Sequence, residues 1–197
     1  MKIILASGSP RRREILEKQG IKFKVIVSEK EEKILYREPE KVVMGLSDMK
    51  AEDVYSRVIK DMQGDVLVIG ADTVVACDGE IFGKPRSESD AFTMLKKLSG
   101  RSHDVFTGVS IKIRENGNET SLNFYEKTEV YVAEITDAEI NDYIKTGEPM
   151  DKAGAYAIQG IGQKFVESVR GSRSNVIGLP KQVTAKLLGG ISHGDDQ

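Results

Sequence analysis

Three consecutive arginines stand where a helix begins near the N-terminus. Residues 3–6 form a short apolar run suited to a buried strand, and Ser9 and Pro10 provide an N-cap and a first helical residue. Arg11, Arg12 and Arg13 then oppose the helix dipole, by roughly 0.3–1 kcal/mol each at an exposed site. That placement is favourable if backbone N–H groups and guanidinium groups hold an anion at this turn, and phosphate is the first candidate. The alternative is a solvated first turn whose arginines point to water.

Carboxylates supply the second set of chemical groups. Asp72 follows the apolar run Val66–Ile69, so we expect it at the end of a strand, where it is suited to act as a metal ligand or general base. An Asp that only bonds its own turn is the other interpretation. Glu31 and Glu32 lie in a charge run typical of a solvated face. A carboxylate from that loop could nevertheless complete a magnesium site with Asp72, because Mg²⁺ is usually held by one or two carboxylates plus substrate oxygens.

Two loop segments carry further polar groups. Lys84 lies between Gly83 and Pro85, where it can reach a phosphate as a point charge, although exposed loop lysines are common. Gln159 lies in a non-periodic segment, residues 148–160, and offers both a donor and an acceptor to a base edge or a bound water.

The elements that position these residues alternate between strands and helices in the first half of the chain, and paired strands dominate the middle. We expect strands at 3–6, 23–28, 66–69, 103–114, 120–135 and 165–169, with hairpin signals at Asp78-Gly79 and Asn116-Gly117. We expect helices at 11–19, 39–62, 88–98 and 137–146, and a C-terminal helix opened by Leu179-Pro180. This order predicts an α/β fold with a mixed sheet, elaborated into two lobes.

Composition excludes several classes of protein. The chain has 29 basic and 31 acidic residues in 197, a balance that argues against a surface that coats nucleic acid. Its single cysteine, Cys77, rules out an intrachain disulfide. The N-terminal apolar run is too short for a signal peptide and no stretch reaches the length of a membrane span, so we expect a cytoplasmic protein with no membrane partner.

Taken together, several segments resemble the Maf family of nucleoside triphosphate pyrophosphatases, proteins linked to septum formation. The matching segments are Ala6–Arg12, Gly70–Val75, Gly83–Pro85, Leu98–His103, Glu148–Tyr156, Ile158–Gly160 and Asn175–Pro180. They occur in family order and cover nearly the whole chain. The resemblance implies an inosine-triphosphatase-like α/β fold, with a mixed, twisted sheet, flanking helices and two lobes around a cleft. It implies one Maf-like domain over residues 1–190, followed by a polar tail, residues 191–197.

The resemblance also implies a reaction: hydrolysis of a nucleoside triphosphate to the monophosphate and pyrophosphate with a divalent cation, Mg²⁺ or Mn²⁺. The identities of Arg11, Thr73 and Gln159 fit the branch that acts on dTTP and UTP, or on modified pyrimidine nucleotides cleared from the pool. Two departures, Ala157 for a usual glycine and Arg173 for a usual aromatic residue, affect the segments expected around the base and sugar.

Site roles follow from the same resemblance. Asp72 is the general base and, with Glu32, a metal ligand; Glu32 and Lys84 complete the catalytic set. The expected substrate-binding residues are Ser7, Arg11, Arg12, Lys50, Thr73 and Gln159. The expected partners are the triphosphate substrate and a second copy of the chain in a homodimer, with no nucleic acid. The alternative function is a nucleotide sensor that regulates cell division through the same cleft with little catalysis.

Overall fold

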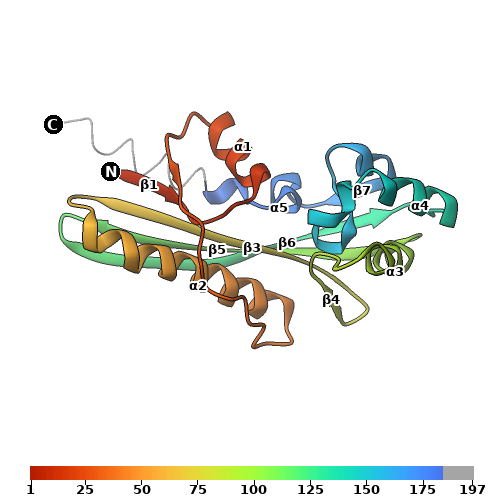
Figure 1. Ribbon diagram of the computed structural model, residues 1–197, viewed down its shortest axis with the longest axis horizontal. Helices are drawn as coiled ribbons and strands as arrows, with labels where there is room; N and C mark the ends of the chain where they lie inside the picture. The colour runs from red at the N-terminus through yellow and green to blue at the C-terminus, as the bar shows by residue number, and fades with distance from the viewer. Residues whose placement is uncertain (184–197) are drawn as a thin grey trace. The chain divides into compact units, whose positions relative to one another are not determined.

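The computed structural model describes residues 1–183, and the expected polar tail lies outside them, as does the chain beyond the opening of the expected C-terminal helix. Figure 1 shows the helices and strands in chain order. They are β1 (Lys2–Leu5), α1 (Pro10–Lys18), β2 (Lys24–Val25), α2 (Pro39–Asp61), β3 (Val66–Cys77), β4 (Glu80–Phe82), α3 (Glu88–Leu98), β5 (Arg101–Glu115), β6 (Asn118–Val132), α4 (Asp137–Lys145), β7 (Val166–Arg170) and α5 (Arg173–Ile177). Short 3₁₀ helices occupy Glu148–Asp151, Ala153–Ala155 and Ile161–Phe165.

The strands form one mixed sheet. Its order is β2-β1-β3-β5-β6-β7, and β4 pairs with β3 off this path. Strand β1 runs parallel to both β2 and β3, whereas the β3–β4 and β6–β7 pairs are antiparallel. The expected α/β class with a mixed sheet and flanking helices is therefore confirmed.

The chain divides into two compact units. Among the described residues, the first comprises Met1–Asp72, Thr107–Glu126 and Gly178–Val183, and the second comprises Thr73–Phe106 and Lys127–Ile177. Strands β3, β5 and β6 each contribute residues to both units. This division agrees with the expected two lobes, and the cleft expected between them stays a prediction.

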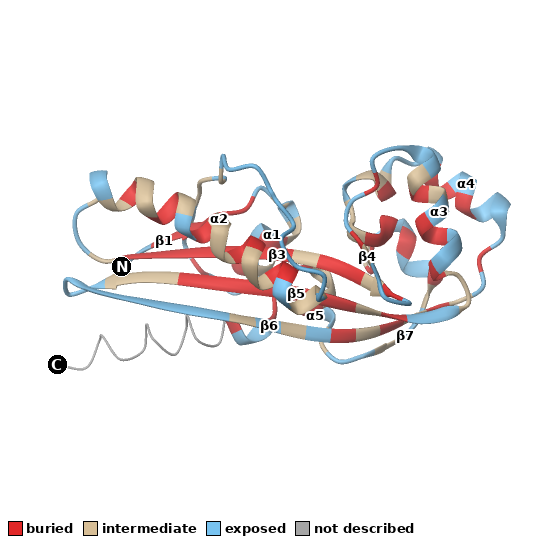
Figure 2. Cartoon of the chain, turned by 90° about the horizontal axis from the view of Figure 1, so that it is seen from below, coloured by how far each residue is buried: buried red, intermediate tan, exposed pale blue. Residues whose placement is uncertain are grey.

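In the first unit, α1 and α2 pack against different side chains of the same two strands, β1 and β3. Leu5 and Ile69 belong to one apolar cluster with Leu16 of α1. Their neighbours Ile4 and Val68 belong to another cluster, which contains residues of α2. Because successive side chains of a strand point to opposite faces, the two helices cover opposite faces of the sheet. Figure 2 shows the resulting buried stretches of β1, β3 and β5 in red.

Helix α2 approaches the sheet more closely than side chains would allow. A Cβ at Gly70 of β3 would lie 2.2 Å from the carbonyl oxygen of Ser47, and one at Gly108 of β5 would lie 2.3 Å from that of Val43. Glycine at both positions therefore lets the backbone of α2 rest almost directly on two strands, which fixes the helix against the sheet.

The second unit confirms several local predictions. The Ser87 hydroxyl accepts a hydrogen bond from the Asp90 backbone and caps α3, and Thr136 forms a capping box with Glu139 at the start of α4. Asp78 and the following glycine both adopt positive φ, 50° and 78°, and turn β3 into β4. These positive φ values are typical of a two-residue hairpin.

Two strand predictions are wrong in length. Strand β2 covers only Lys24–Val25, because the chain beyond it leaves the sheet and is held by Asp53 of α2 instead. Strand β3 extends from Val66 to Cys77, so Asp72 lies inside a strand and not at its end. The β-branched residues Thr73, Val74 and Val75 continue the strand past the carboxylate.

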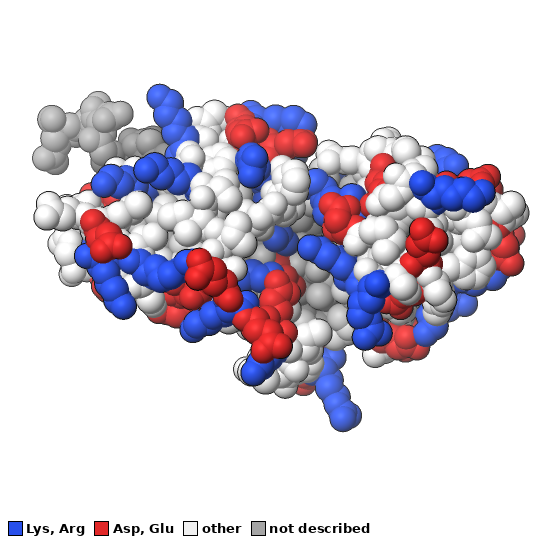
Figure 3. Space-filling model, in the orientation of Figure 1, with Lys and Arg blue, Asp and Glu red and all other residues white. Residues whose placement is uncertain are grey.

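The surface carries both signs of charge. On the face drawn in Figure 3, acidic and basic side chains are interspersed. None of the helices in residues 1–183 combines the length and apolar character that crossing a bilayer requires.

Candidate active site

Asp72 meets a lysine of α2. Alternation along β3 places Asp72 on the same face as Val68 and Gly70, the face covered by α2. The Nζ of Lys50 lies 2.6 Å from Oδ1 of Asp72, and both side chains are largely buried, with 13% and 11% exposed. The close approach of α2 at Gly70 brings these two residues into contact, since Ala51, next to Lys50, is one of the residues that a Gly70 Cβ would strike.

Glu32 reaches the same ammonium group. Its Oε1 lies 2.8 Å from Nζ of Lys50, and its side chain is 54% exposed. The structure thus brings together three predicted site residues, Glu32, Lys50 and Asp72, from a loop, a helix and a strand. One lysine nitrogen bridges the two carboxylates that we expected to share a metal ion.

The loop that carries Glu32 is anchored at its base by α2. Asp53 accepts hydrogen bonds from the Ser28 hydroxyl at 2.9 Å and the Glu29 amide at 3.0 Å. Arg57 contacts the Glu29 carboxylate at 2.7 Å and the Val27 carbonyl oxygen at 2.9 Å. Sequence reasoning missed Asp53 and Arg57. Asp53 follows Lys50 by three residues and Arg57 follows Asp53 by four, so all three lie on one face of α2. That spacing was the available sequence signal.

Arg12 lies in the first turn of α1, and its side chain is buried. Its Nη1 donates to the Ser7 hydroxyl and its Nε donates to the Gly178 carbonyl oxygen, each at 2.8 Å. Ser9 occupies the N-cap position as expected, but its side chain forms no capping hydrogen bond. Arg13 is exposed, and Arg11 is intermediate in burial. Of the three arginines, Arg12 therefore fixes the turn from within.

Burial and charge act against each other at Asp72. Burial raises the pKa of the Asp72 carboxyl, and the positive charges of Lys50 and Arg12 oppose that rise. Burial also lowers the pKa of the Arg12 guanidinium, which the charge of Asp72 counteracts. A carboxylate with a raised pKa is a better proton acceptor near neutral pH than an ordinary aspartate, which suits a general base.

The carboxylate pair fits a divalent cation. Asp72 and Glu32 direct one oxygen each toward a single point, where Lys50 places its own positive charge. Mg²⁺ and Mn²⁺ prefer oxygen ligands, and Mg²⁺ in particular is commonly held by one or two carboxylates together with water and phosphate oxygens. In the part of the chain that the structure describes, no group of three or more His, Cys, Asp or Glu side chains is arranged for a metal ion. The candidate site is thus a pair of carboxylates.

The remaining predicted residues lie in the second unit. Thr73 follows Asp72 in β3 with intermediate burial, Lys84 is exposed after β4, and Gln159 has intermediate burial. The Gly154 amide donates to the Gly83 carbonyl oxygen at 3.0 Å, which ties the Lys84 segment to the loop that carries Gln159. The approach of Lys84 and Gln159 to Asp72 stays a prediction.

Two residues that sequence reasoning missed hold the Gln159 loop. Glu148 accepts hydrogen bonds from the backbone of Ile161 at 3.0 Å and Gly162 at 2.9 Å, and from the Tyr143 hydroxyl at 2.8 Å. The same hydroxyl accepts from the Ala157 amide at 3.2 Å. Backbone on both sides of Gln159 is therefore fixed by one carboxylate and one phenol.

One departure from the family pattern also contacts this loop. The Nη2 of Arg173 donates to the carbonyl oxygen of Ile158 at 3.4 Å, next to Gln159. The unusual arginine thus lies beside the segment expected to meet the base.

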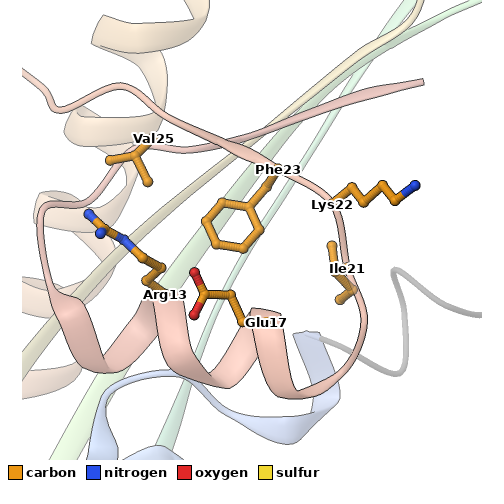
Figure 4. A pocket seen from close by; sticks show the side chains of 6 residues that line it. All are labelled: Arg13, Glu17, Ile21, Lys22, Phe23 and Val25. Atoms are coloured by element: carbon orange, nitrogen blue, oxygen red, sulfur yellow. The ribbon is translucent and has the colours of Figure 1, made fainter.

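A separate open pocket of about 540 Å³ lies beside α1. Figure 4 shows the Phe23 ring turned toward α1, with Arg13 and Glu17 on that helix and Lys22 pointing away. Its lining contains Arg13 but none of the residues expected to bind substrate.

Comparison with known proteins decides the family. The Maf-like protein family matches residues 2–191. A dTTP/UTP pyrophosphatase of Caldicellulosiruptor saccharolyticus is 50% identical over 180 residues, which cover 91% of this chain and 89% of that protein. The dTTP/UTP pyrophosphatase of Bacillus thuringiensis subsp. konkukian is 46% identical over 180 residues, 91% of this chain and 90% of that protein.

The chain belongs to the Maf family. The resemblance described from the sequence is thereby confirmed, and the Maf segments now have positions: Ala6–Arg12 covers the β1–α1 turn and the first three residues of α1, and Gly70–Val75 lies within β3. Among solved structures, the Ham1 protein of Staphylococcus aureus is similar with a TM-score of 0.43 and 12% identity, covering 100% of both chains.

Proposed function

We propose that this Maf protein is a nucleoside triphosphate pyrophosphatase that hydrolyses dTTP and UTP to the nucleoside monophosphate and pyrophosphate. The observation that carries the proposal is the contact of Lys50 with both Asp72 and Glu32 close to the buried charge of Arg12. The names of relatives that are 46% and 50% identical support the substrate.

The first unit supplies the groups for phosphate chemistry. Asp72 accepts a proton from the attacking water, since its burial raises its pKa. Arg11 contacts phosphate oxygens at the start of α1, and Arg12 adds charge while holding Ser7 and the turn in place. Lys50 moves its charge from the carboxylates to the phosphates when substrate enters.

The second unit supplies Lys84, Thr73 and Gln159. Lys84 neutralises charge on the leaving pyrophosphate as a point charge. Gln159 reads the polar edge of the pyrimidine, for which an amide offers both a donor and an acceptor. Thr73 contributes a hydroxyl beside Asp72 in β3.

The cation has a defined place in this proposal. Asp72 and Glu32 would hold Mg²⁺ or Mn²⁺. Such an ion, when bound, supplies positive charge that stabilises the phosphate oxygens in the transition state.

The chemical step balances with water as the only co-reactant. The water oxygen bonds to the α-phosphorus, and the bond between that phosphorus and the oxygen that bridges to the β-phosphorus breaks. The proton released from water passes to Asp72, and the leaving pyrophosphate carries the electron pair of the broken bond. Positive groups around the phosphates offset the charge that develops there.

Asp72→Asn tests whether Asp72 is needed as base or as metal ligand. We expect turnover to fall by about 10²- to 10⁴-fold, the usual contribution of a general base, while the protein stays folded. Release of monophosphate and pyrophosphate from dTTP and UTP measures turnover, and circular dichroism reports the fold. Asp61→Asn, at the exposed C-terminal end of α2, is the matched control.

Labelled water identifies the bond that is cleaved. Oxygen-18 from water should appear in the monophosphate, and its appearance in pyrophosphate would contradict attack at the α-phosphorus. Release of orthophosphate without pyrophosphate would indicate another phosphohydrolase. Nucleotide binding without turnover by the wild-type protein would favour the sensor of cell division.

A further inference from the structure

The Lys50 ammonium lies where the two candidate metal ligands converge. It lies 2.6 Å from Asp72 Oδ1 and 2.8 Å from Glu32 Oε1, so it contacts both carboxylates at once. A cation held by both oxygens would need the position that Nζ occupies. Binding of such a cation therefore requires Lys50 to withdraw from these carboxylates.

Charge makes that withdrawal unfavourable without substrate. Asp72 interacts with Lys50, Arg12 and Glu32, and the four side chains together carry no net charge. A divalent cation added alone leaves two uncompensated positive charges beside largely buried groups, and it pushes the Lys50 ammonium away from its partners. A triphosphate removes both obstacles, because its oxygens neutralise the cation and offer new acceptors to Lys50.

We propose that Lys50 acts as an internal substitute cation that couples metal binding to triphosphate binding. The free enzyme binds a divalent cation weakly at Asp72 and Glu32, and it takes up the cation together with the triphosphate. Lys50 is in this respect a positioning residue whose movement opens the carboxylate pair. The inference rests on the proposed function, because it uses the cation site proposed there.

A second lysine on the same sheet face provides a matched control. Lys112 also bridges two carboxylates of α2, Asp48 at 2.8 Å and Glu52 at 3.2 Å, and its side chain is 15% exposed. Asp48 additionally accepts a hydrogen bond from the Ser110 hydroxyl at 2.8 Å. Lys112 thus matches Lys50 in partners and burial but belongs to no predicted substrate or metal site.

The test measures Mn²⁺ binding in the absence of nucleotide, by electron paramagnetic resonance and calorimetry. Lys50→Met should bind Mn²⁺ about tenfold more tightly than wild type, within the usual range of coupling between sites. Lys50→Arg keeps the charge and should stay weak, and any gain in Lys112→Met, which frees Asp48 and Glu52, should be smaller than the gain in Lys50→Met. Adding Asp72→Asn to Lys50→Met should abolish the gain, which places the ion at the carboxylate pair.

The coupling itself is measured with a dTTP analogue in which a methylene group replaces the α,β-bridging oxygen. Mn²⁺ affinity of the wild type should rise when the analogue is present, and the rise should be smaller in Lys50→Met. Equal or weaker Mn²⁺ binding by a folded Lys50→Met protein would overturn the proposal. An equal gain of Mn²⁺ affinity in Lys50→Arg and Lys50→Met would also overturn the proposal, since repulsion by the retained charge would then play no part.

The Mn²⁺ binding measurements test the coupling independently of the proposed enzymatic activity. Failure of the wild type to release pyrophosphate would reject the enzymatic activity, yet the nucleotide-free Mn²⁺ measurements would still report whether Lys50 competes with a cation. Conversely, an active enzyme whose Mn²⁺ affinity ignores Lys50 would reject only the coupling.

Discussion

Gly70 of β3 lies so close to Ser47 of α2 that a Cβ on Gly70 would be 2.2 Å from the Ser47 carbonyl oxygen. The next residue on that face of β3 is Asp72, and Lys50 follows Ser47 on the helix by three residues. The packing distance between helix and strand therefore sets the ion pair of the candidate active site.

Gly70→Ala should disturb both stability and activity. The added methyl group meets backbone atoms of Ser47 and Ala51, which cannot move without shifting α2. Overpacking of this kind costs about 1–3 kcal/mol of unfolding free energy, and the shift should separate Lys50 from Asp72 and reduce pyrophosphate release. Urea denaturation and the turnover assay measure the two effects.

Gly45→Ala is the control on the same helix. Its Cβ meets only the ring of Tyr36, at 3.2 Å. Alanine is favoured over glycine in a helix interior by up to about 1 kcal/mol, so this variant should be as stable as wild type or more stable. Equal behaviour of the two alanine variants would contradict the role of Gly70.

Glu32→Gln should specifically weaken the affinity of the enzyme for the divalent cation. Because Glu32 shares Lys50 with Asp72, its loss removes half of the proposed carboxylate pair. Replacing partners outside a metal's ligand set costs about 10- to 100-fold in affinity or activity, so loss of a direct ligand should raise the half-saturating Mg²⁺ concentration at least about tenfold. Titration of turnover with Mg²⁺ measures this.

The neighbouring Glu31→Gln serves as its control. Glu31 is 81% exposed and lies 3.6 Å from Lys33. Its Mg²⁺ dependence should match that of wild type. An equal shift in both variants would mean that the loop's overall charge, and not the position of Glu32, determines cation binding.

Arg12→Lys should destabilise the protein although the charge is kept. Lysine cannot reproduce the two hydrogen bonds that Nε and Nη1 donate to Gly178 and Ser7. Hydrogen bonds to charged groups contribute about 1.5–3 kcal/mol, so urea denaturation should show a loss of about 2 kcal/mol. Arg13→Lys, at an exposed position, should stay within about 0.5 kcal/mol of wild type. A similar loss in both would contradict the internal role of Arg12.

His103 should make stability depend on pH. This histidine is buried, its Nε2 lies 2.7 Å from the Tyr156 hydroxyl, and burial lowers its pKa from 6.5 to about 4. Between those values the unfolded chain binds a proton and the folded protein does not. The stabilisation is therefore complete above pH 6.5 and is lost as pH falls toward 4, by roughly 3 kcal/mol in all.

Urea denaturation at several pH values from 7 to 4 measures that dependence. The His103→Gln protein lacks this titrating group. Between pH 7 and pH 4, its unfolding free energy should therefore fall by roughly 3 kcal/mol less than that of wild type. Parallel curves for the two proteins would show that other groups produce the pH dependence.

Local signals predicted much of the fold. The hairpins at Asp78-Gly79 and Asn116-Gly117 and the caps at Ser87 and Thr136 were recognisable because each depends on residues adjacent or nearly adjacent in the chain. The end of β3 was misplaced, because Gly70 and Asp72 are residue types depleted in strands and interrupt the apolar run, whereas the strand continues through the β-branched residues beyond Asp72.

The candidate site also combines contacts that the local sequence predicted with contacts that it did not. Ser7 and Arg12 are five residues apart, and the sequence places them in one turn. The anchor of Arg12 at Gly178 lies 166 residues away and carries no local signal, because any backbone carbonyl can accept that bond. Sequence therefore predicted which arginines lie at the turn but not which of them is buried.

The sequence by itself determined the family, the α/β class and the residue types available for phosphate and metal chemistry, because these follow from composition, short motifs and local periodicity. Tertiary structure decided that Lys50 stands between Glu32 and Asp72. Those residues come from a helix, a loop and a strand, and they meet only because α2 packs directly on Gly70 and Gly108. Contacts of that kind depend on how closely a helix can approach a sheet, a distance that long-range packing sets and no single segment encodes.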